Sequence, residues 1–192
     1  HSLHDALVER VVAKAAALVI GPGDRPGITM GPLVADSARA IVHAAVETAV
    51  ADGAEVVCGG APCAGDALDA GSFYPATVLT GVHNGSAMSR DEVFGPVIGF
   101  ETIGDLDEAI ASANAVEYGL AAAICTTDLA AAQRFAAEVQ AGMVRINRPT
   151  VGAAFNAPFG GVKQSGTGTH KEQLGPTVMD FYTVSRTVWL GS

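Results

Sequence analysis

A heptapeptide, Asp91-Glu92-Val93-Phe94-Gly95-Pro96-Val97, most constrains how this chain can fold. Because a proline fixes its own φ and disfavours the α conformation of the preceding residue, Pro96 forces a bend ahead of an apolar strand. The bend leaves Glu92 and Phe94 at the end of that strand, where α/β proteins bind ligands. A carboxylate can accept two hydroxyl groups, and a ring can pack on a flat heterocycle. The alternative is a solvated acid beside a core phenylalanine, as is usual for these residue types.

A second stretch, residues 157–168, reads Ala-Pro-Phe-Gly-Gly-Val-Lys-Gln-Ser-Gly-Thr-Gly. Together the two stretches resemble the aldehyde dehydrogenase superfamily, whose members carry E-[IV]-F-G-P-V and, further on, P-F-G-G-x-K-x-S-G-x-G. Further matches follow in the family's order over nearly the whole chain, at residues 30–33, 58–60, 74–79, 114–122, 141–144, 146–147 and 181–183. Chance is a poor explanation for blocks in this order.

The resemblance implies an α/β fold, with a mostly parallel sheet flanked by helices and a C-terminal assembly strand. Residues 1–176 would form a partial catalytic domain, and residues 177–192 an oligomerisation strand that builds a homo-oligomer. The whole enzyme would oxidise an aldehyde to a carboxylate with NAD or NADP. Residues 145–152 look closest to members that act on semialdehydes such as 2-oxoglutarate semialdehyde. Arg145 or Arg148 is then a candidate anchor for an anionic substrate.

The resemblance also implies roles for single residues. Glu92 would hold the nicotinamide-side ribose and Phe94 would pack near the nicotinamide. Phe159 resembles the aromatic wall of the aldehyde tunnel, although a core phenylalanine that anchors the loop is an equal alternative. Asn147 ends a strand ahead of a long glycine-rich loop and is a candidate substrate-binding residue. We expect Glu92, Phe94 and Phe159 to face one chamber.

Many family members continue S-G-x-G-R-E, in which the Glu serves as a proton relay or second base. Here Ser165-Gly-Thr-Gly168 is followed by Thr-His-Lys-Glu-Gln. An ungapped alignment places His170 at the position of that Glu, whereas a two-residue insertion places Glu172 there. We favour the insertion, which makes Glu172 the candidate proton relay, with a solvated Glu as the alternative.

The family's nucleophilic thiol stands in a G-Q-x-C-type stretch, and none of Cys58, Cys63 or Cys125 has that context. Cys58 and Cys125 end apolar strands, which predicts buried thiols, and Cys63 is expected to be exposed in a loop. The dinucleotide-binding domain, the general base and the oxyanion Asn of the family also precede this point. We therefore expect a C-terminal fragment, inactive alone, that binds NAD or NADP weakly or not at all.

The alternative comes from another functional class. A chain with this scaffold and no nucleophile could be a non-catalytic binding or assembly module that pairs with a full-length relative. A G-Q-x-C motif in the coding sequence upstream of His1 would favour the fragment, and a start codon there would favour the module.

Composition narrows the partners. The formal net charge is −9, so the field of the protein disfavours nucleic acid and anionic membranes. Three scattered cysteines favour a reducing compartment, and neither they nor the five histidines have metal-ligand spacing. The apolar run at residues 11–20 is interrupted by Lys14 and lacks the features of a signal peptide. These observations predict a cytoplasmic protein without a metal site.

Periodicity along the chain predicts alternating helices and strands. Expected helices begin near residue 3, at Asp36 or Ser37, at Asp105 and at Asp128. Expected strands cover residues 55–58, 73–82, 97–103, 121–125, 143–147 and 178–190. Parallel pairing is expected where a helix connects two strands.

Overall fold

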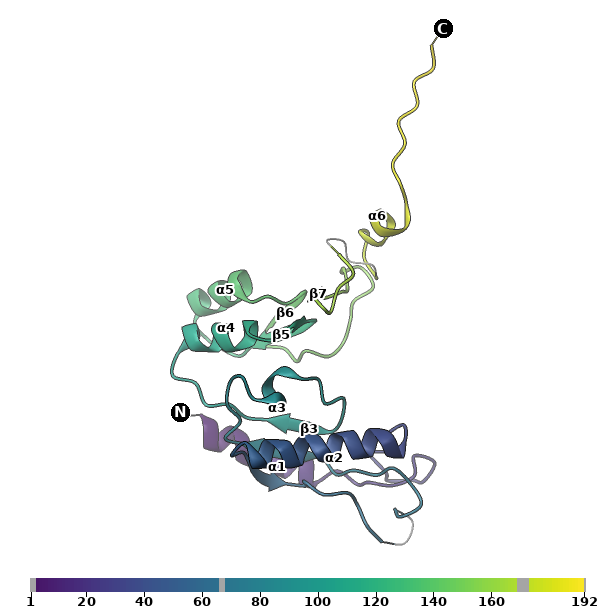
Figure 1. The fold of residues 1–192 in the computed structure, drawn as a ribbon. Coiled ribbons are helices and arrows are strands. Elements are labelled where there is room, and N and C mark those ends of the chain that lie inside the picture. Colours follow the sequence, from purple (N-terminus) through teal and green to yellow (C-terminus); the bar gives the residue numbers. More distant parts are fainter. Residues whose placement is uncertain (1–2, 66–67, 169–172, 192) are drawn as a thin grey trace. The chain divides into compact units, whose positions relative to one another are not determined.

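The computed structural model describes residues 3–65, 68–168 and 173–191 (Figure 1). The chain divides into two compact units, residues 1–104 and 105–192. Each unit combines helices with short sheets, which confirms the α/β class.

The first unit contains one three-stranded sheet in the order β1-β2-β3. Strands β1 (Glu55–Cys58) and β2 (Thr77–Thr80) pair antiparallel, and β2 pairs parallel with β3 (Val97–Gly99). The helices are α1 (His4–Ala16), α2 (Asp36–Ala51) and the short α3 (Ala87–Arg90). The three expected strands of this unit are present, and the second and third are shorter than predicted.

The core of the first unit joins α2 to the central strand. Val42, Val46 and Ala49 of α2 are buried against a cluster that includes Tyr74 and Leu79. Burial raises the pKa of Tyr74, with a smaller contribution from the carboxylate of Glu47. The tyrosine hydroxyl lies 3.2 Å from Nδ1 of His43, so this buried polar group has a partner.

The spacing of Leu3, Leu7, Val11 and Ala15 predicts that these residues form the buried face of the first helix, and the structure differs in part. Leu3 and Leu7 are exposed, whereas Val8, Val11 and Val12 are half-buried on the side that contacts β1 and β2. Gly21 and Pro22 predict the end of this helix, and it ends earlier, at Ala16. The apolar positions of this segment cover more than one face, so spacing alone did not select the buried one.

The second unit contains two small sheets. Strands β5 (Ala121–Ile124) and β6 (Met143–Ile146) pair parallel through α5 (Leu129–Glu138), as predicted. Strands β4 (Tyr118–Gly119) and β7 (Val162–Lys163) pair antiparallel. Helix α4 (Leu106–Asn114) precedes β4. The predicted Asp128 cap is present, because its side chain accepts from Ala130 N–H, and Asp105 also caps α4 by accepting from Glu108 N–H. The cap predicted at Asp36 or Ser37 is absent, because the N-cap residue of α2 is Ala35 and it makes no side-chain cap bond.

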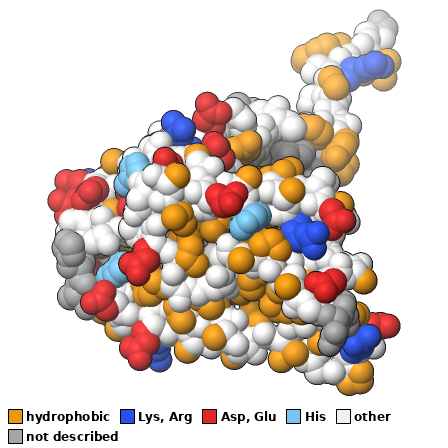
Figure 2. Space-filling view, turned by 60° about the horizontal axis from the view of Figure 1, so that its bottom comes forward, with side chains coloured by type: hydrophobic (Ala, Val, Ile, Leu, Met, Phe, Trp, Pro, Cys, Tyr) orange, Lys and Arg blue, Asp and Glu red, His pale blue; other side chains and the backbone are white. Residues whose placement is uncertain are grey.

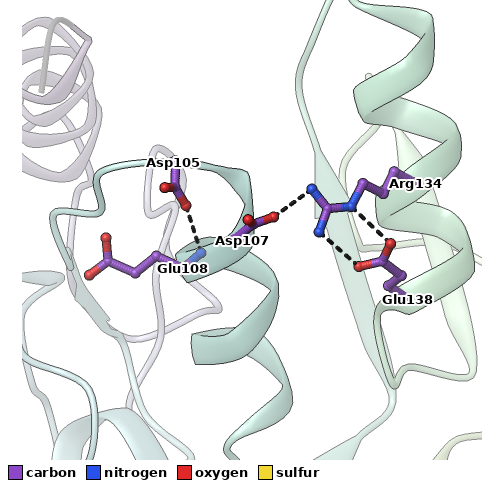
Figure 3. A network of polar contacts seen from close by, with 5 residues as sticks. All are labelled: Asp105, Asp107, Glu108, Arg134 and Glu138. Carbon is purple, nitrogen blue, oxygen red and sulfur yellow. Dashed lines mark hydrogen bonds and ion pairs between the residues drawn. The ribbon is translucent and has the colours of Figure 1, made fainter.

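Helices α4 and α5 cover one face of the β5–β6 pair. Ile110, Phe135 and Val139 form its buried cluster, with Val144 packed against it. At the surface, Arg134 of α5 donates to the Glu138 carboxylate through Nε and Nη2, and its Nη1 lies 2.5 Å from Oδ1 of Asp107 of α4 (Figure 3). These interactions raise the pKa of Arg134, with the Glu138 hydrogen bond as the largest cause. Exposed pairs add little stability one by one, so the apolar cluster holds the layer together.

The C-terminal segment corrects one prediction. Residues 178–182, expected to begin a strand, form the short helix α6 (Val178–Tyr182). The following residues are extended and belong to no strand among the described residues. Val184, Trp189 and Leu190 are at least nine-tenths exposed, so much apolar surface lies open to solvent. The assignment of residues 177–192 to an oligomerisation strand stays a prediction.

Within the described ranges, none of the helices has the length and apolar character that crossing a bilayer requires. Figure 2 shows acidic side chains scattered over one face of the molecule, as expected from the net charge of −9.

Candidate functional site

The heptapeptide of the first unit is fixed by its glycine and proline. A Cβ atom on Gly95 would lie 2.4 Å from Cγ2 of Val42, so only glycine lets this backbone pack on α2. The Pro96 carbonyl accepts from Thr77 N–H at 2.8 Å, which joins the bend to β2. The expected bend ahead of an apolar strand is therefore present, and buried groups on both sides hold it in place.

Phe94 is displayed by this bend. Its φ is +50°, in the left-handed region that costs a non-glycine residue about 1–2 kcal/mol, and its side chain is 83% exposed. Glu92, two residues earlier, is also exposed. The interpretation of Phe94 as a core residue is therefore wrong for this structure. Strained backbone that presents an exposed ring is typical of functional sites.

The second motif lies in the second unit, where it docks on residues 117–119. Strand β7 pairs with β4, and Gly119 N–H donates to Oγ of Ser165 at 3.1 Å. A Cβ atom on Gly161 would lie 2.3 Å from the Ser165 carbonyl oxygen, so this glycine permits a close approach of the backbone at residue 165. The structure thus brings together two sequence blocks, residues 114–122 and 157–168, that were recognised separately.

Lys163 is a structural residue that the sequence reasoning missed. Its Nζ donates to the carbonyl oxygens of Asn114 and Val116, both at 2.8 Å, at the end of α4. A cation at this place also complements the negative end of the helix dipole. Asn114 in turn joins the end of α4 to α5, because its side-chain amide donates to the Glu138 carbonyl and accepts from Gln140 N–H. The available signal was a lysine within a loop of small residues and without a nearby acid.

Phe159 is half-buried and lines a cavity of about 320 Å³. The described lining comprises residues 142–145, 153–154 and 157–159. Phe159 N–H also donates to the Gln173 carbonyl at 2.8 Å, which ties the motif to the chain ahead of α6. The residue thus borders a cavity and ties the loop down through its backbone, and its role as a wall of the aldehyde tunnel stays a prediction.

Asn147 lies at the carboxyl end of β6 with φ +54°. Its side-chain Oδ1 accepts from Thr126 N–H and its Nδ2 donates to the Thr126 carbonyl, both at 2.9 Å. The side-chain amide therefore takes the place of a backbone amide and extends the hydrogen bonding of β5 and β6 by one step. It orients the start of the loop at residue 148, and this engagement competes with direct contact to a substrate.

The predicted site residues fall in different parts of the chain. Glu92 and Phe94 belong to the first unit, and Phe159 and Asn147 belong to the second. Their convergence on one chamber stays a prediction. His170 and Glu172, the two candidates for the proton relay, lie outside the described residues.

All three thiols differ from the expectation. Cys58, predicted to be buried at the end of its strand, is half-buried. Cys125 is exposed, although its place after an apolar strand predicted burial, and Cys63 is half-buried, although a loop position predicted exposure. Burial raises the pKa of Cys63, which disfavours the nucleophilic thiolate. Among the described residues no cluster of His, Cys, Asp and Glu has the geometry to hold a metal ion.

Comparisons with known proteins agree with this arrangement. The family described as "Aldehyde dehydrogenase family" matches residues 1–188. An alpha-ketoglutarate semialdehyde dehydrogenase of Haloferax volcanii is 40% identical over 187 residues, which are 97% of this chain and 38% of the relative. A succinate-semialdehyde dehydrogenase [NADP(+)] of Mycolicibacterium paratuberculosis is 40% identical over 190 residues, which are 99% of this chain and 39% of the relative.

Solved structures show the same likeness. A putative aldehyde dehydrogenase from Burkholderia cenocepacia superposes with a TM-score of 0.92 at 36% identity, over 99% of this chain and 38% of that one. A point mutant of betaine aldehyde dehydrogenase from Staphylococcus aureus in complex with NAD+ gives a TM-score of 0.88 at 32% identity, over 97% of this chain and 37% of that one. The chain thus spans under two fifths of the length of these structures. The motifs, their structural setting and these matches together show that the chain belongs to the aldehyde dehydrogenase family.

Proposed function

We propose that this chain supplies part of the cofactor wall and part of the substrate wall of an enzyme that oxidises an aldehyde to a carboxylate with NAD or NADP. The observation that carries the proposal is the display of Glu92 and Phe94 by a bend that Gly95 and Pro96 anchor. The bound dinucleotide would accept the hydride in such a reaction.

The exposed groups of the heptapeptide fit a nicotinamide nucleoside. An ionised carboxylate only accepts hydrogen bonds, and two ribose hydroxyls are donors that it can hold together. The ring of Phe94 is open to solvent and offers an apolar face of the size of a nicotinamide. Glu92 would fix the ribose, and Phe94 would limit the positions that the attached ring can take.

The loop from Asn147 to Phe159 would form the substrate side. Relatives of the chain include proteins named alpha-ketoglutarate semialdehyde dehydrogenase, succinate-semialdehyde dehydrogenase and 2,5-dioxopentanoate dehydrogenase, which supports a semialdehyde as substrate. Other relatives are named betaine aldehyde dehydrogenase, and betaine aldehyde is a cation. A kinetic panel of carboxylated, neutral and cationic aldehydes decides between these classes, and equal efficiencies would count against a semialdehyde.

We further propose that this chain is inactive alone, because none of its three thiols stands in the setting of the family nucleophile. Its exposed C-terminal segment, with Val184, Val188 and Trp189, would pair with another subunit to form a homo-oligomer in the cytoplasm. The same surface also suits the alternative, a non-catalytic assembly module that pairs with a full-length relative.

A chimera tests the proposal. In it, this chain replaces the homologous segment of the 40% identical Haloferax volcanii relative. We expect the chimera to reduce NAD or NADP with an aldehyde and the chain alone to produce no reduced dinucleotide. A folded chimera without activity would favour the assembly module, and turnover by the chain alone would contradict the proposed division of roles.

A further inference from the structure

The cavity beside Phe159 contains a charged group at a fixed place. Apart from Arg145, the described lining residues are apolar or glycine, and they come from β6 and from the loop at residues 153–159. A volume of about 320 Å³ is at the lower end of the range of small-molecule pockets, which begins at roughly 300 Å³. An apolar chamber with one cation suits a short organic anion.

Arg145 is directed to this cavity by the alternation of β6. All three consecutive residues Met143, Val144 and Arg145 border the cavity, and because Val144 also packs into the cluster under α4 and α5, the alternation of the strand places the side chains of Met143 and Arg145 on the opposite face. The guanidinium donates through Nη2 to the carbonyl of Gly152, a residue with a φ of +92°. This contact fixes the side chain while a guanidinium retains further donors in its planar fork.

Arg148 does not share these features. It is exposed and does not belong to the described lining of the cavity, although it lies only three residues further along the chain. The structure therefore separates two arginines that sequence position alone leaves equivalent. Arg148 is the matched control in any test of Arg145.

Charge makes the difference consequential. The chain has a formal net charge of −9, so its overall field repels an anionic ligand. The half-buried Arg145 offsets this repulsion locally, because ion pairing strengthens where water is partly excluded. An Arg–carboxylate pair also gains orientation from two parallel hydrogen bonds.

We propose that this cavity binds the carboxylate group of a carboxylate-bearing aldehyde, with Arg145 as its anchor and Phe159 as its apolar wall. That the ligand is an aldehyde rests on the proposed function, whereas its carboxylate group is inferred from the cavity alone. Arg145 is then the residue that selects an anionic substrate over a neutral one.

Binding to the chain itself tests this without turnover. The probes are 4-oxopentanoate, which carries a carboxylate and an unreactive carbonyl, and its methyl ester, which lacks only the charge. The methionine methyl groups are labelled with ¹³C, since Met143 lines the cavity and Met30, Met88 and Met179 do not belong to its described lining. We expect the acid to shift the Met143 signal selectively and to bind roughly tenfold more tightly than the ester.

Two variants complete the test. Arg145→Gln should abolish the preference for the acid, whereas Arg148→Gln should leave it unchanged. Arg145→Lys keeps the charge and loses the fork, so it should retain part of the preference. If Arg145→Gln fails to fold, the comparison of acid and ester on the unaltered chain still decides. Equal titrations of the two probes, or an acid that leaves Met143 unmoved, would overturn the proposal.

The result is separable from the proposed function. An inactive chimera together with acid-selective binding at Met143 would contradict the dehydrogenase role and support the carboxylate site. An active chimera without acid-selective binding would support the enzyme and overturn this inference.

Discussion

The two motifs that identify this chain are held in place by different forces. In the first unit, the bend at residues 91–97 is anchored mainly by packing, because Gly95 lies directly on Val42 of α2. In the second unit, residues 161–165 are anchored mainly by hydrogen bonds from Lys163 and to Ser165. The first motif displays its polar and aromatic side chains, and the second uses its polar side chains to dock a loop. A recognisable motif can thus either expose side chains for a ligand or use them to attach a loop, and the structure distinguishes the two cases.

The largest effect is expected for Gly161→Ala. The new methyl group would lie 2.3 Å from the Ser165 carbonyl oxygen, which is backbone and cannot move aside alone. We expect a loss of about 3 kcal/mol, at the upper end for overpacking, confined to the second unit. Hydrogen exchange should show faster exchange near residues 117–119 and unchanged exchange in α2. Gly23→Ala, at a position with open space, is the control and should change neither region.

Gly95→Ala is the corresponding change in the first unit. Its methyl group would meet the Val42 side chain at 2.4 Å, and a side chain can adjust more than a backbone carbonyl. We expect a loss of about 1–3 kcal/mol and faster exchange in α2 and β2. An equal increase of hydrogen exchange in both units of this variant would contradict the independence of the two anchors.

Lys163→Met tests the hydrogen-bonded anchor directly. The change leaves the carbonyl oxygens of Asn114 and Val116 without their charged donor, which should cost about 1–3 kcal/mol. Lys14→Met, at an exposed position of α1, serves as the control. A Lys163 variant as stable as this control in urea unfolding would show that the attachment depends on the β4–β7 pairing alone.

The smallest effect on stability is expected for Phe94→Ala. Because this ring is 83% exposed, its removal should change the free energy of unfolding by less than about 0.5 kcal/mol. A loss above 1 kcal/mol by the same urea measurement would show that the ring packs in the folded chain and would return Phe94 to the core interpretation.

Local signals in the sequence predicted most of the second unit. Asp105 and Asp128 indicated where their helices begin, and a helix between two apolar runs predicted the parallel pair β5–β6. Wrong predictions arose where a local pattern has two outcomes. The apolar, β-branched tail at residues 178–190 suits a strand, yet residues 178–182 form a helix and the chain offers the rest no partner strand among its described residues.

The site was predictable to a different extent. Display of Glu92 follows from Pro96 and Gly95, which are local constraints. The roles of Lys163 and Asn147 depend on carbonyl groups 49 and 21 residues away, and such contacts leave no periodic pattern in the sequence. The distinction between Arg145 and Arg148 likewise needed the direction of β6 and the position of Gly152.

The most direct test of the account measures the Michaelis constant for the dinucleotide in the chimera carrying Glu92→Gln. The account predicts a rise of about tenfold or more, because an ionised acceptor of two hydroxyl hydrogen bonds is replaced by a neutral amide. Glu55→Gln, at an exposed position of β1, should leave the constant unchanged. An unaltered Michaelis constant in the Glu92 variant would contradict the assignment of the displayed acid to the cofactor.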